Sequence, residues 1–434
     1  MTGLPPGSAL PSVLQSIWWA LRPLAFAETY RRRYGSLFTT RIYPFGPVVY
    51  VADPALVKEV MTAPAGKFRA GDANRVVEFL VGSRSLLLLD GPGHTASRRT
   101  LMPAFHGDSL AGYAAQIQSA ASEIDSWPRD QPISLHHRLH RIALDVMIQV
   151  VLGVRDADTA AELHQLVPRL FRFDPLVILV PKLRIDLGPR SPWGRFVRVR
   201  DRVDQILYQQ IAERERDPGQ GSDALSLLIR ASRARGGGLD QVELRDHLIT
   251  LLAVGPETTA TAMAWCVERL VRHPSVLARL REDMAGGGDS YLDAVIHETL
   301  RVRPVTMDIA RTLAEDTDIA SYRVPAGTMI VIPLGLLHSS AELYNQPREF
   351  RPERFLDAAP PAHHFLPFGG GPHRCLGASF AMEEMRALLR YMVSALDMVP
   401  VTPQPERQRS SGPTLIPALG TKVVIRDRAL RAVV

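Results

Sequence analysis

The stretch that decides the fold is "FGGGPHRCLG", residues Phe368–Gly377. Three glycines and a proline hold the backbone in a tight, irregular path before Cys375, and a helix is predicted to begin near Gly377. The thiol therefore lies at the N-terminal end of a helix, where the dipole and free amide groups favour thiolate, and Arg374 adds positive charge. We expect Cys375 to be a functional thiolate rather than a small buried apolar residue.

Three chemistries are open to such a thiolate: binding zinc, acting as a nucleophile, or ligating haem iron. His363, His364 and His373 are near in sequence, but no second cysteine is, and the spacing does not suit structural zinc. A nucleophile would need a histidine base elsewhere, which the sequence leaves open. The other cysteine, Cys266, is expected to be a buried apolar residue, so no disulfide is predicted.

The composition indicates one ordinary globular enzyme-sized unit. The chain has 434 residues, of which 46% are apolar and 22% charged, and no stretch reads as a convincing linker. We therefore expect a single domain over residues 1–434. The net charge of +6 is spread along the chain with no basic block that alternates with aromatics, so we expect no nucleic-acid partner.

The N-terminal segment carries no signal for a membrane. Its apolar run is broken by Arg22 and Pro23, it is too short to span a bilayer, and it lacks the layout of a signal peptide. We expect a cytoplasmic protein without a membrane anchor, and a monomer.

The pattern of apolar residues predicts a mainly α fold with small β sheets. A β-rich portion at about 36–53 contains a Pro-Phe-Gly-Pro turn typical of a hairpin, a helical body follows, and further β-rich segments lie at about 305–335 and 413–427. The longest helix is predicted from Asp240, with Glu243 completing a capping box, to His273. It would be roughly 50 Å long and cross the whole protein, with Pro256 near its middle.

Four motifs, in order along the chain, resemble those of cytochrome P450. The haem-thiolate signature is phenylalanine, two variable residues, glycine, three variable residues, cysteine, one variable residue and glycine. It is matched by Phe368, Gly371, Cys375 and Gly377. In "ETLR", Glu298 and Arg301 match the buried Glu-x-x-Arg pair, which the resemblance joins to Arg354 of a Pro-Glu-Arg-Phe segment.

A third motif, "DGPGHTASRRTLMPAF", places His94 and Arg98 one helical turn apart, as in the His-x-x-x-Arg pair that contacts a haem propionate. Arg311 and His373 fall where the family has further propionate partners. The resemblance implies heme b with Cys375 as the axial ligand of the iron. The expected cofactor-binding residues are His94, Arg98, Arg311, Phe368, Gly369, His373 and Cys375.

The fourth motif lies within the long helix, where Gly255, Pro256, Glu257 and Thr258 occupy the family's oxygen-activation positions. Val254 replaces the usual alanine or glycine, which narrows the space above the iron. By resemblance, the Thr258 hydroxyl bonds back to the Val254 carbonyl where the helix opens in a kink, and we expect Pro256 to help fix that kink. Thr258 and Glu257 are the predicted catalytic residues, which bind oxygen and deliver protons.

The fold implied by the resemblance has this long kinked helix over the haem and the cysteine loop beneath it. The implied activity is that of a soluble bacterial haem monooxygenase, which inserts one atom of dioxygen into a substrate. An aliphatic pocket suggests a lipophilic small molecule such as a terpenoid, fatty acid or polyketide, as in secondary metabolism. The expected substrate contacts are Ala253, Val254, Val305, Met307, Asp308 and Leu415.

Two further expectations concern this pocket, one about an acidic residue and one about a lid. Asp308 is an unusual acid in an apolar region, and it either selects a polar group on the substrate or points outward. A lid over the pocket is predicted from an apolar segment containing Phe171, Phe173, Leu176, Ile178 and Leu179.

Electrons are expected from a separate ferredoxin or flavodoxin, because the chain carries no fused reductase segment. Two alternatives stand beside the monooxygenase: a peroxide-dependent haem peroxygenase, which Pro256 favours, and a non-catalytic haem sensor. The substrate, the regiochemistry and the choice between hydroxylation, desaturation, epoxidation and coupling are not encoded in these motifs.

Overall fold

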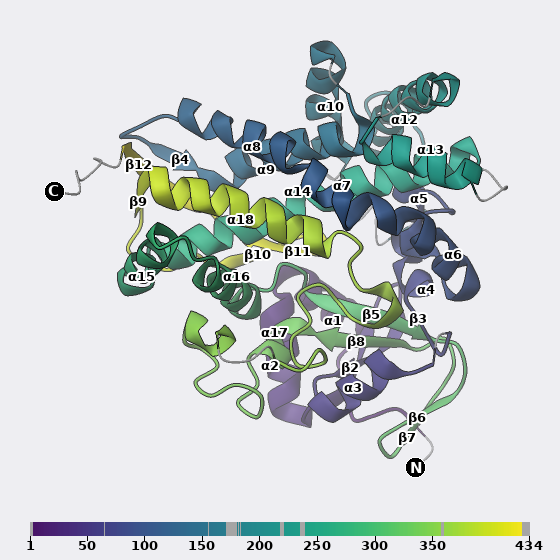
Figure 1. The fold of residues 1–434 in the computed structure, drawn as a ribbon. Helices are drawn as coiled ribbons and strands as arrows, with labels where there is room; N and C mark the ends of the chain where they lie inside the picture. Colours follow the sequence, from purple (N-terminus) through teal and green to yellow (C-terminus); the bar gives the residue numbers. More distant parts are fainter. Residues whose placement is uncertain are drawn as a thin grey trace.

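The computed structural model describes residues 3–64, 66–154, 156–170, 180, 182, 184–217, 221–234, 239–356 and 360–427. As predicted, it is mainly helical, with the largest β-sheet on one side of the helical body and shorter strands elsewhere (Figure 1). Among the described helices, none is both long and apolar enough to cross a membrane.

The longest described helix is α14, Gln241–Leu270, with 30 residues and a length of about 45 Å. It begins where the Asp240 carboxylate accepts the Glu243 amide at 2.9 Å, which confirms the predicted N-terminal cap. It ends three residues before the predicted His273. The helix continues across Pro256, so the proline is accommodated without breaking the helix.

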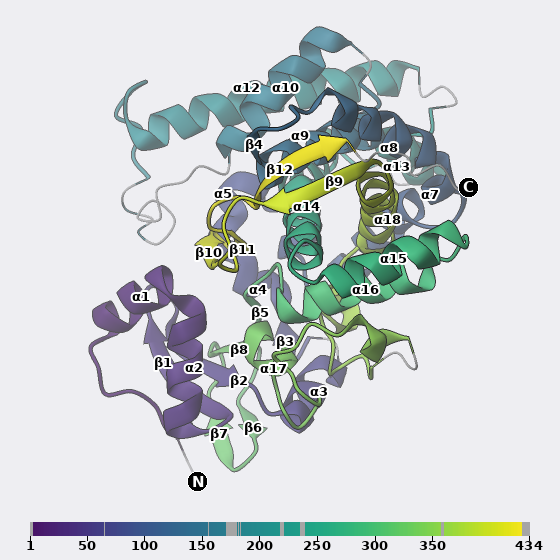
Figure 2. The same ribbon diagram turned by 90° about the vertical axis from the view of Figure 1, so that its left-hand side faces the viewer.

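The other helices are arranged around α14, which Figure 2 shows nearly end-on in the middle of the molecule. Those that pack most closely on it are α9 (Leu135–Met147), α12 (Pro192–Arg216), α16 (Ser290–Val302) and α18 (Ala378–Ala395). The remaining longer helices are α1 (Ser12–Leu21), α2 (Pro23–Tyr34), α3 (Pro54–Thr62), α6 (Gly91–Leu101), α8 (Ala114–Ala121), α10 (Ala157–Leu170), α13 (Ala224–Ala234) and α15 (Pro274–Ala285).

Short helical turns connect these elements. They are α4 (Ala70–Asn74), α5 (Glu78–Val81), α7 (Asp108–Gly112), α17 (Leu334–His338), η1 (Arg75–Val77), η2 (Leu86–Leu88), η3 (Met102–Phe105), η4 (Ser122–Ser126), η5 (Ile148–Leu152), η7 (Pro352–Phe355) and η8 (Gly371–His373).

The main sheet has five strands in the order β1-β2-β8-β5-β3. The predicted hairpin is formed by β1 (Leu37–Ile42) and β2 (Gly46–Val51), in antiparallel register with Phe38 opposite Tyr50. Strand β2 pairs in parallel with β8 (Met329–Pro333), which pairs antiparallel with β5 (Asp308–Leu313). Strand β3 (Phe68–Arg69) closes the far edge.

Three smaller sheets complete the β structure. The C-terminal strand β12 (Lys422–Asp427) lies between β4 (Pro132–Ser134) and β9 (Leu396–Pro400). Two hairpins are formed by β6 (Thr317–Ile319) with β7 (Tyr322–Val324), and by β10 (Gln408–Ser411) with β11 (Thr414–Pro417). An isolated bridge between Thr306 and Thr414 joins the β10–β11 hairpin to the segment before β5.

The two faces of the main sheet pack against different parts of the core. Val49 and Ile309 belong to one apolar cluster, whereas Tyr50 and Val331 belong to another that includes residues of α2. Because side chains alternate along a strand, consecutive residues of β5 point into these two different environments. This alternation decides which residues of β5 can share one site.

Candidate active site

The loop before α18 has the tight path that its glycines predict. The Cys375 amide donates to the Phe368 carbonyl at 2.8 Å, which closes the loop on itself. Gly369 and Gly371 have φ values of 69° and 65°, a region that side chains other than glycine rarely adopt. A Cβ on Gly371 would also lie 3.0 Å from the Met61 carbonyl oxygen. The loop therefore needs glycine at these positions.

Cys375 faces an internal space. Its side chain is accessible, yet the surrounding protein desolvates it, and this burial raises the pKa of the thiol. The Gly377 amide, Arg98 and Arg374 act in the opposite direction without reversing the shift. The expectation that the helix end would lower this pKa overall is therefore wrong, because the predicted favourable groups are present but are outweighed by desolvation.

Helix α6 and strand β5 bring two guanidinium groups to the same loop. Arg98 Nη1 donates to the Arg374 carbonyl at 2.7 Å, and Arg311 Nη2 lies 3.5 Å from the Gly370 carbonyl. Burial lowers the pKa of Arg311 to about 10, so the group remains a cation at neutral pH. The structure thus brings together Arg98, Arg311 and the loop of Cys375, as the sequence predicted.

The two predicted histidines lie beside these cations and contact each other. The rings of His94 and His373 stack with centroids 3.8 Å apart. Burial, followed by the charges of His373 and Arg98, lowers the pKa of His94 to about 4. His94, His373 and Arg311 line a pocket of about 70 Å³ that is bounded on another side by α3 and the following loop.

Asp90 belongs to this cluster, although sequence analysis did not single it out. Its Oδ1 lies 3.3 Å from His373 Nε2 and accepts the Ala70 amide at 2.9 Å. Burial opposes ionisation, but the hydrogen bonds from His373 and from the backbone hold the pKa of Asp90 below its ordinary value. Its position just before the predicted helix was the available signal.

On α14, Thr258 has the hydrogen bond that the resemblance predicted. Its Oγ1 donates to the Val254 carbonyl at 2.8 Å and lies 3.1 Å from that of Gly255. Val254 is 45% exposed in the middle of a helix whose neighbouring residue Ala253 is buried. The turn around Val254 and Thr258 therefore borders an open space.

The carboxylate of Glu257 contacts α9. His140 Nε2 lies 3.3 Å from Glu257 Oε2, and His136 Nε2 lies 3.7 Å from Oε1. Burial raises the pKa of Glu257, with Arg409 acting in the opposite direction. Sequence analysis missed both histidines, although their separation by four residues on a predicted helix put them on one face.

A second acid, Glu384 of α18, was also missed. Its side chain is buried and forms a hydrogen bond with that of Thr259, while burial raises the pKa of Glu384 to about 8. Among the described residues, its Oε1 has no hydrogen-bond partner. The signal in the sequence was an acid at a position of α18 flanked by buried apolar residues.

Several predicted substrate contacts lie in the core. Leu415 is 1% exposed, its amide donates to the Val305 carbonyl at 2.7 Å, and its carbonyl accepts Trp265 Nε1 at 2.9 Å. Val305 and Ala253 are buried likewise, at 8% and 6% exposed. Met307 is partly exposed. The predicted lid residues Phe171, Phe173, Leu176, Ile178 and Leu179 lie outside the described residues.

Asp308 and Arg311 lie on opposite faces of β5. Asp308 shares its face with Ala310, which packs with the cluster containing Tyr50, and its charge acts on Tyr50. Asp308 therefore lies on the side of β5 that faces the cluster of Tyr50, and Arg311 lies on the other side. The alternative that Asp308 points outward is wrong, because burial raises the pKa of Asp308 to about 7.

The predicted network around Glu298 is present. Arg301 Nε and Nη2 donate to the two Glu298 carboxylate oxygens at 2.7 and 2.8 Å, and Arg354 Nε donates at 3.1 Å. Arg301 also donates to the carbonyls of His338, Pro347 and Glu349. The network joins α16 to η7 and to the segment that leads towards the loop.

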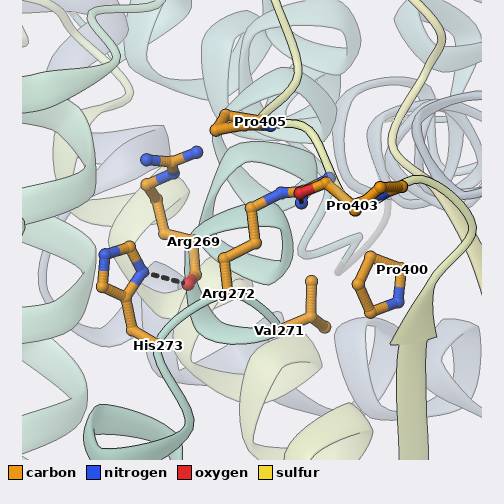
Figure 3. A pocket seen from close by; sticks show the side chains of 7 residues that line it. All are labelled: Arg269, Val271, Arg272, His273, Pro400, Pro403 and Pro405. Atoms are coloured by element: carbon orange, nitrogen blue, oxygen red, sulfur yellow. Dashed lines mark hydrogen bonds between the residues drawn. The ribbon is translucent and has the colours of Figure 1, made fainter.

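A separate pocket of about 440 Å³ lies at the C-terminal end of α14 (Figure 3). Its two arginines share one acid: Arg272 Nε donates to Glu268 at 2.7 Å, and Arg269 pairs with the same carboxylate. Arg269 is eleven residues beyond Thr258, or roughly 16 Å along the helix. This pocket is larger than the one beside His94, but it lies apart from Cys375 and Thr258.

The donor set around Cys375 fits a haem. One accessible thiol faces an internal space, and cations from α6, β5 and the loop stand near it, as two carboxylates on a flat ligand require. The apolar, exposed side chain of Val254 borders an open space on the central helix. These features provide a sulfur ligand for iron, an apolar surface and positive charge.

The chain belongs to the cytochrome P450 family, whose model matches residues 4–423. It is 40% identical over 433 residues to putative cytochrome P450 135B1 of Mycobacterium tuberculosis, covering 98% of this chain and 92% of the relative. It is also 36% identical over 435 residues to putative cytochrome P450 137 of the same species, covering 98% and 91%.

Solved structures show the same fold. The cyanobacterial CYP120A1, solved with retinoic acid bound, superposes with a TM-score of 0.86 at 24% identity, covering 98% of this chain and 99% of that one. The cytochrome P450DA heme domain superposes with a TM-score of 0.85 at 22% identity, covering 98% of each chain. The protein is therefore a cytochrome P450 monooxygenase, an oxidoreductase that uses dioxygen and a haem with a cysteine thiolate ligand.

Proposed function

We propose that Cys375 is the thiolate ligand of the haem iron in a single catalytic domain formed by residues 1–434. The supporting observation is its place in a glycine-shaped loop where its sulfur is accessible to an internal space. Cys266 is fully buried, and burial raises the pKa of its thiol to about 12, which leaves Cys375 as the competent ligand. Metal binding deprotonates a ligating thiol and so overcomes the raised pKa of Cys375.

Four side chains hold the haem propionates in this proposal: His94, Arg98, Arg311 and His373. Arg98 and Arg311 provide charge-assisted donors, and His94 provides a neutral ring donor because of its low pKa. Asp90 fixes the His373 ring by accepting from it. Phe368 and Gly369 contribute the backbone turn that presents Cys375.

The bound haem supplies the chemistry that activates dioxygen. Thr258 and Glu257 deliver protons to that reaction. The Thr258 hydroxyl is oriented by its hydrogen bond to the Val254 carbonyl, which leaves the lone pairs of Oγ1 free to accept a hydrogen bond. Glu257 is an ionisable neighbour whose raised pKa brings it closer to neutral pH, as a general acid requires.

The substrate is a lipophilic small molecule, such as a terpenoid, fatty acid or polyketide of secondary metabolism. Val254 offers an exposed apolar side chain next to Thr258, and Met307 adds a flexible one. The retinoic acid bound to the cyanobacterial CYP120A1 is an apolar chain with one polar end, a shape of this kind. Electrons come from a ferredoxin or flavodoxin that docks near the exposed Arg374, so reduction should slow at high salt.

The main support for this proposal is the accessible thiol of Cys375. An absorption spectrum tests it. The reduced, carbon monoxide-bound protein should show the red-shifted band that a thiolate ligand gives, and Cys375→Ser should abolish it. Cys266→Ser is the matched control and should keep the band. A Cys375→Ser protein that retains the band would rule out this ligand.

A peroxide-dependent peroxygenase is the second candidate, because Pro256 stands beside the oxygen-activating pair. The two activities are separated by comparing product formed with peroxide alone and product formed with a redox partner and dioxygen. Monooxygenase activity requires the second system to be the faster. Faster turnover with peroxide alone would favour the alternative.

A further inference from the structure

Glu257 lies at the interface of α14 with α9, between the turn of Thr258 and two histidines. His136 and His140 are one helical turn apart on α9, so their rings share the face that packs on α14. Each ring is directed at one carboxylate oxygen: His140 Nε2 lies 3.3 Å from Oε2 and His136 Nε2 lies 3.7 Å from Oε1. Both oxygens of the acid therefore have an imidazole neighbour.

The three side chains form a partly exposed path. The exposed fractions are 29% for Glu257, 20% for His140 and 13% for His136. His136 Nε2 also lies 2.9 Å from Thr261 Oγ1, a contact that fixes the His136 ring on α14. His140 has the more accessible ring, so it is the member of the pair that can exchange protons with water.

Burial, with the charges around this cluster, leaves the imidazoles neutral near pH 7. Burial and the neighbouring histidines lower the pKa of both His136 and His140 to about 4. His137 of α9 acts on both rings, and His164 of α10 acts on His140. From β10, the exposed Arg409 acts on Glu257 and on His136. His164 in turn faces Asp145 at 3.3 Å.

A neutral imidazole can accept a proton on one ring nitrogen and release another from the other nitrogen. A guanidinium cannot do this, because it stays protonated. The two imidazoles that face Glu257 from α9 can therefore exchange protons. Their contact with the Glu257 carboxylate allows them to pass a proton to it.

We propose that His140 passes protons from solvent to Glu257, and that His136 is a positioning residue that holds the Glu257 carboxylate. This inference rests on the proposed role of Glu257 and Thr258. In each cycle, solvent gives a proton to His140 Nδ1 and the Nε2 proton moves to Glu257 Oε2; exchange with water then returns His140 to its Nε2–H tautomer. The Glu257 O–H bond breaks as its proton passes to Thr258 Oγ1, and Thr258 releases its own hydroxyl proton towards the oxygen-activation site, so both side chains return to their starting state. Each step breaks one N–H or O–H bond and forms another, so no oxidant or reductant is needed.

The test uses the holoenzyme with four substitutions: His140→Gln, His136→Gln, Glu257→Gln and the matched control His137→Gln. His137 is an exposed histidine of the same helix. The readouts are product per electron pair consumed, hydrogen peroxide released and the solvent deuterium isotope effect. Haem content, the carbon monoxide band and the substrate-induced spin shift show whether each variant is folded and loaded.

We expect His140→Gln to lower product per electron pair about tenfold, release peroxide in its place and change the isotope effect, because a proton-transfer step is lost. His136→Gln should have a smaller effect in the same direction, and His137→Gln none. His140→Asn is the conservative variant: it keeps an N–H donor but cannot relay a proton, so it should be as uncoupled as His140→Gln.

A second readout does not depend on turnover. The ring protons of His136 and His140 are titrated by nuclear magnetic resonance in the diamagnetic, reduced carbon monoxide form. Glu257→Gln should displace the midpoints of both rings and leave that of His137 in place, because it removes the carboxylate that faces them. Unmoved midpoints would show that the contact does not exist in solution.

The two proposals fail differently. If Glu257→Gln is uncoupled while His140→Gln and His140→Asn couple like the unaltered enzyme, the relay is refuted and the role of Glu257 stands. If Glu257→Gln and Thr258→Ala both couple normally, the proton-delivery role itself is refuted, and the relay with it.

Discussion

Two acids on neighbouring core helices, Glu298 of α16 and Glu257 of α14, each face a pair of basic side chains. Glu298 is fully buried and accepts from the guanidinium groups of Arg301 and Arg354 at 2.7 to 3.1 Å. Glu257 retains exposure and faces the imidazoles of His136 and His140 at 3.7 and 3.3 Å. The comparison separates an acid that is fixed in place from an acid that can exchange protons.

The difference follows from the chemistry of the bases. Guanidinium stays charged at any physiological pH and forms a rigid fork, so it holds the Glu298 carboxylate in one geometry. The buried imidazoles lose their charge, since the pKa of each falls to about 4, and cannot hold Glu257 ionised in the same way. Burial then raises the pKa of Glu257. We infer that the identity of the basic partners distinguishes the structural acid Glu298 from the proposed proton donor Glu257.

The largest effect is expected for Glu298→Gln, which leaves two buried guanidinium groups without their counter-charge. The free energy of unfolding should fall by about 3–5 kcal/mol. Denaturant unfolding of the holoenzyme measures it. Asp318→Asn is the control, because its ion pair with Arg323 is exposed and contributes at most about 1 kcal/mol. Equal losses in the two variants would contradict the structural role of Glu298.

Asp308 extends the comparison to an acid whose pKa burial alone raises, from 3.8 to about 7. Between those values the folded protein binds a proton that the unfolded chain has released, so the free energy of unfolding falls as pH rises. Asp308→Asn should remove that fall and raise the free energy of unfolding by about 2 kcal/mol above pH 8. This value is smaller than the one that corresponds to the full pKa shift, because solvent screening weakens the effect.

The measurement for Asp308→Asn is denaturant unfolding across this pH range. The two proteins should converge below about pH 3, where the folded and unfolded forms both carry the proton for most of the time. A stability difference that does not change with pH would show that Asp308 does not titrate in this window.

Thr258→Ala is expected to affect the reaction more than the fold. Removing a hydroxyl that bonds only to the helix backbone should change the free energy of unfolding by less than about 1 kcal/mol. Product per electron pair should fall about tenfold, because a proton donor beside the oxygen site is lost. Thr258→Ser keeps the hydroxyl and should retain most of the coupling. Normal coupling in Thr258→Ala would show that another group delivers the proton, and Glu384 would be the next candidate.

The smallest effect is expected for Pro256→Ala. The new amide can donate to the Leu252 carbonyl, but α14 is already helical across this turn, so the gain in unfolding free energy should be below about 1 kcal/mol. A more rigid turn should lower coupling slightly, in the direction of Thr258→Ala. Unchanged stability and coupling would show that the proline is only tolerated there.

The parts of the fold that sequence predicted are those governed by local rules. The Pro-Phe-Gly-Pro turn predicted the β1–β2 hairpin, the Asp240 cap predicted the start of α14, and the Glu298–Arg301 spacing predicted an ion pair on one helix face. Each of these features depends on residues a few positions apart, so the local sequence pattern is sufficient to predict it.

The features that sequence analysis missed or left undecided arise where distant segments meet. Leu415 is packed against Trp265, which is 150 residues away in the chain, and Asp308 faces the cluster of Tyr50 because of the strand alternation of β5. The raised pKa of Cys375 depends on how much protein surrounds it, which local motifs do not state. His136, His140 and Glu384 were missed for the same reason.

The sequence by itself determined the family, the position of Cys375, the glycines that shape its loop and the Glu257–Thr258 pair, because these are fixed residues at fixed spacings. Only the tertiary structure decided that Glu257 faces two imidazoles and that Glu384 forms a hydrogen bond with Thr259. It also decided that Asp308 and Arg311 lie on opposite faces of β5. The physical reason is that protonation and access depend on contacts between helices and strands far apart in the chain, and packing alone creates those contacts.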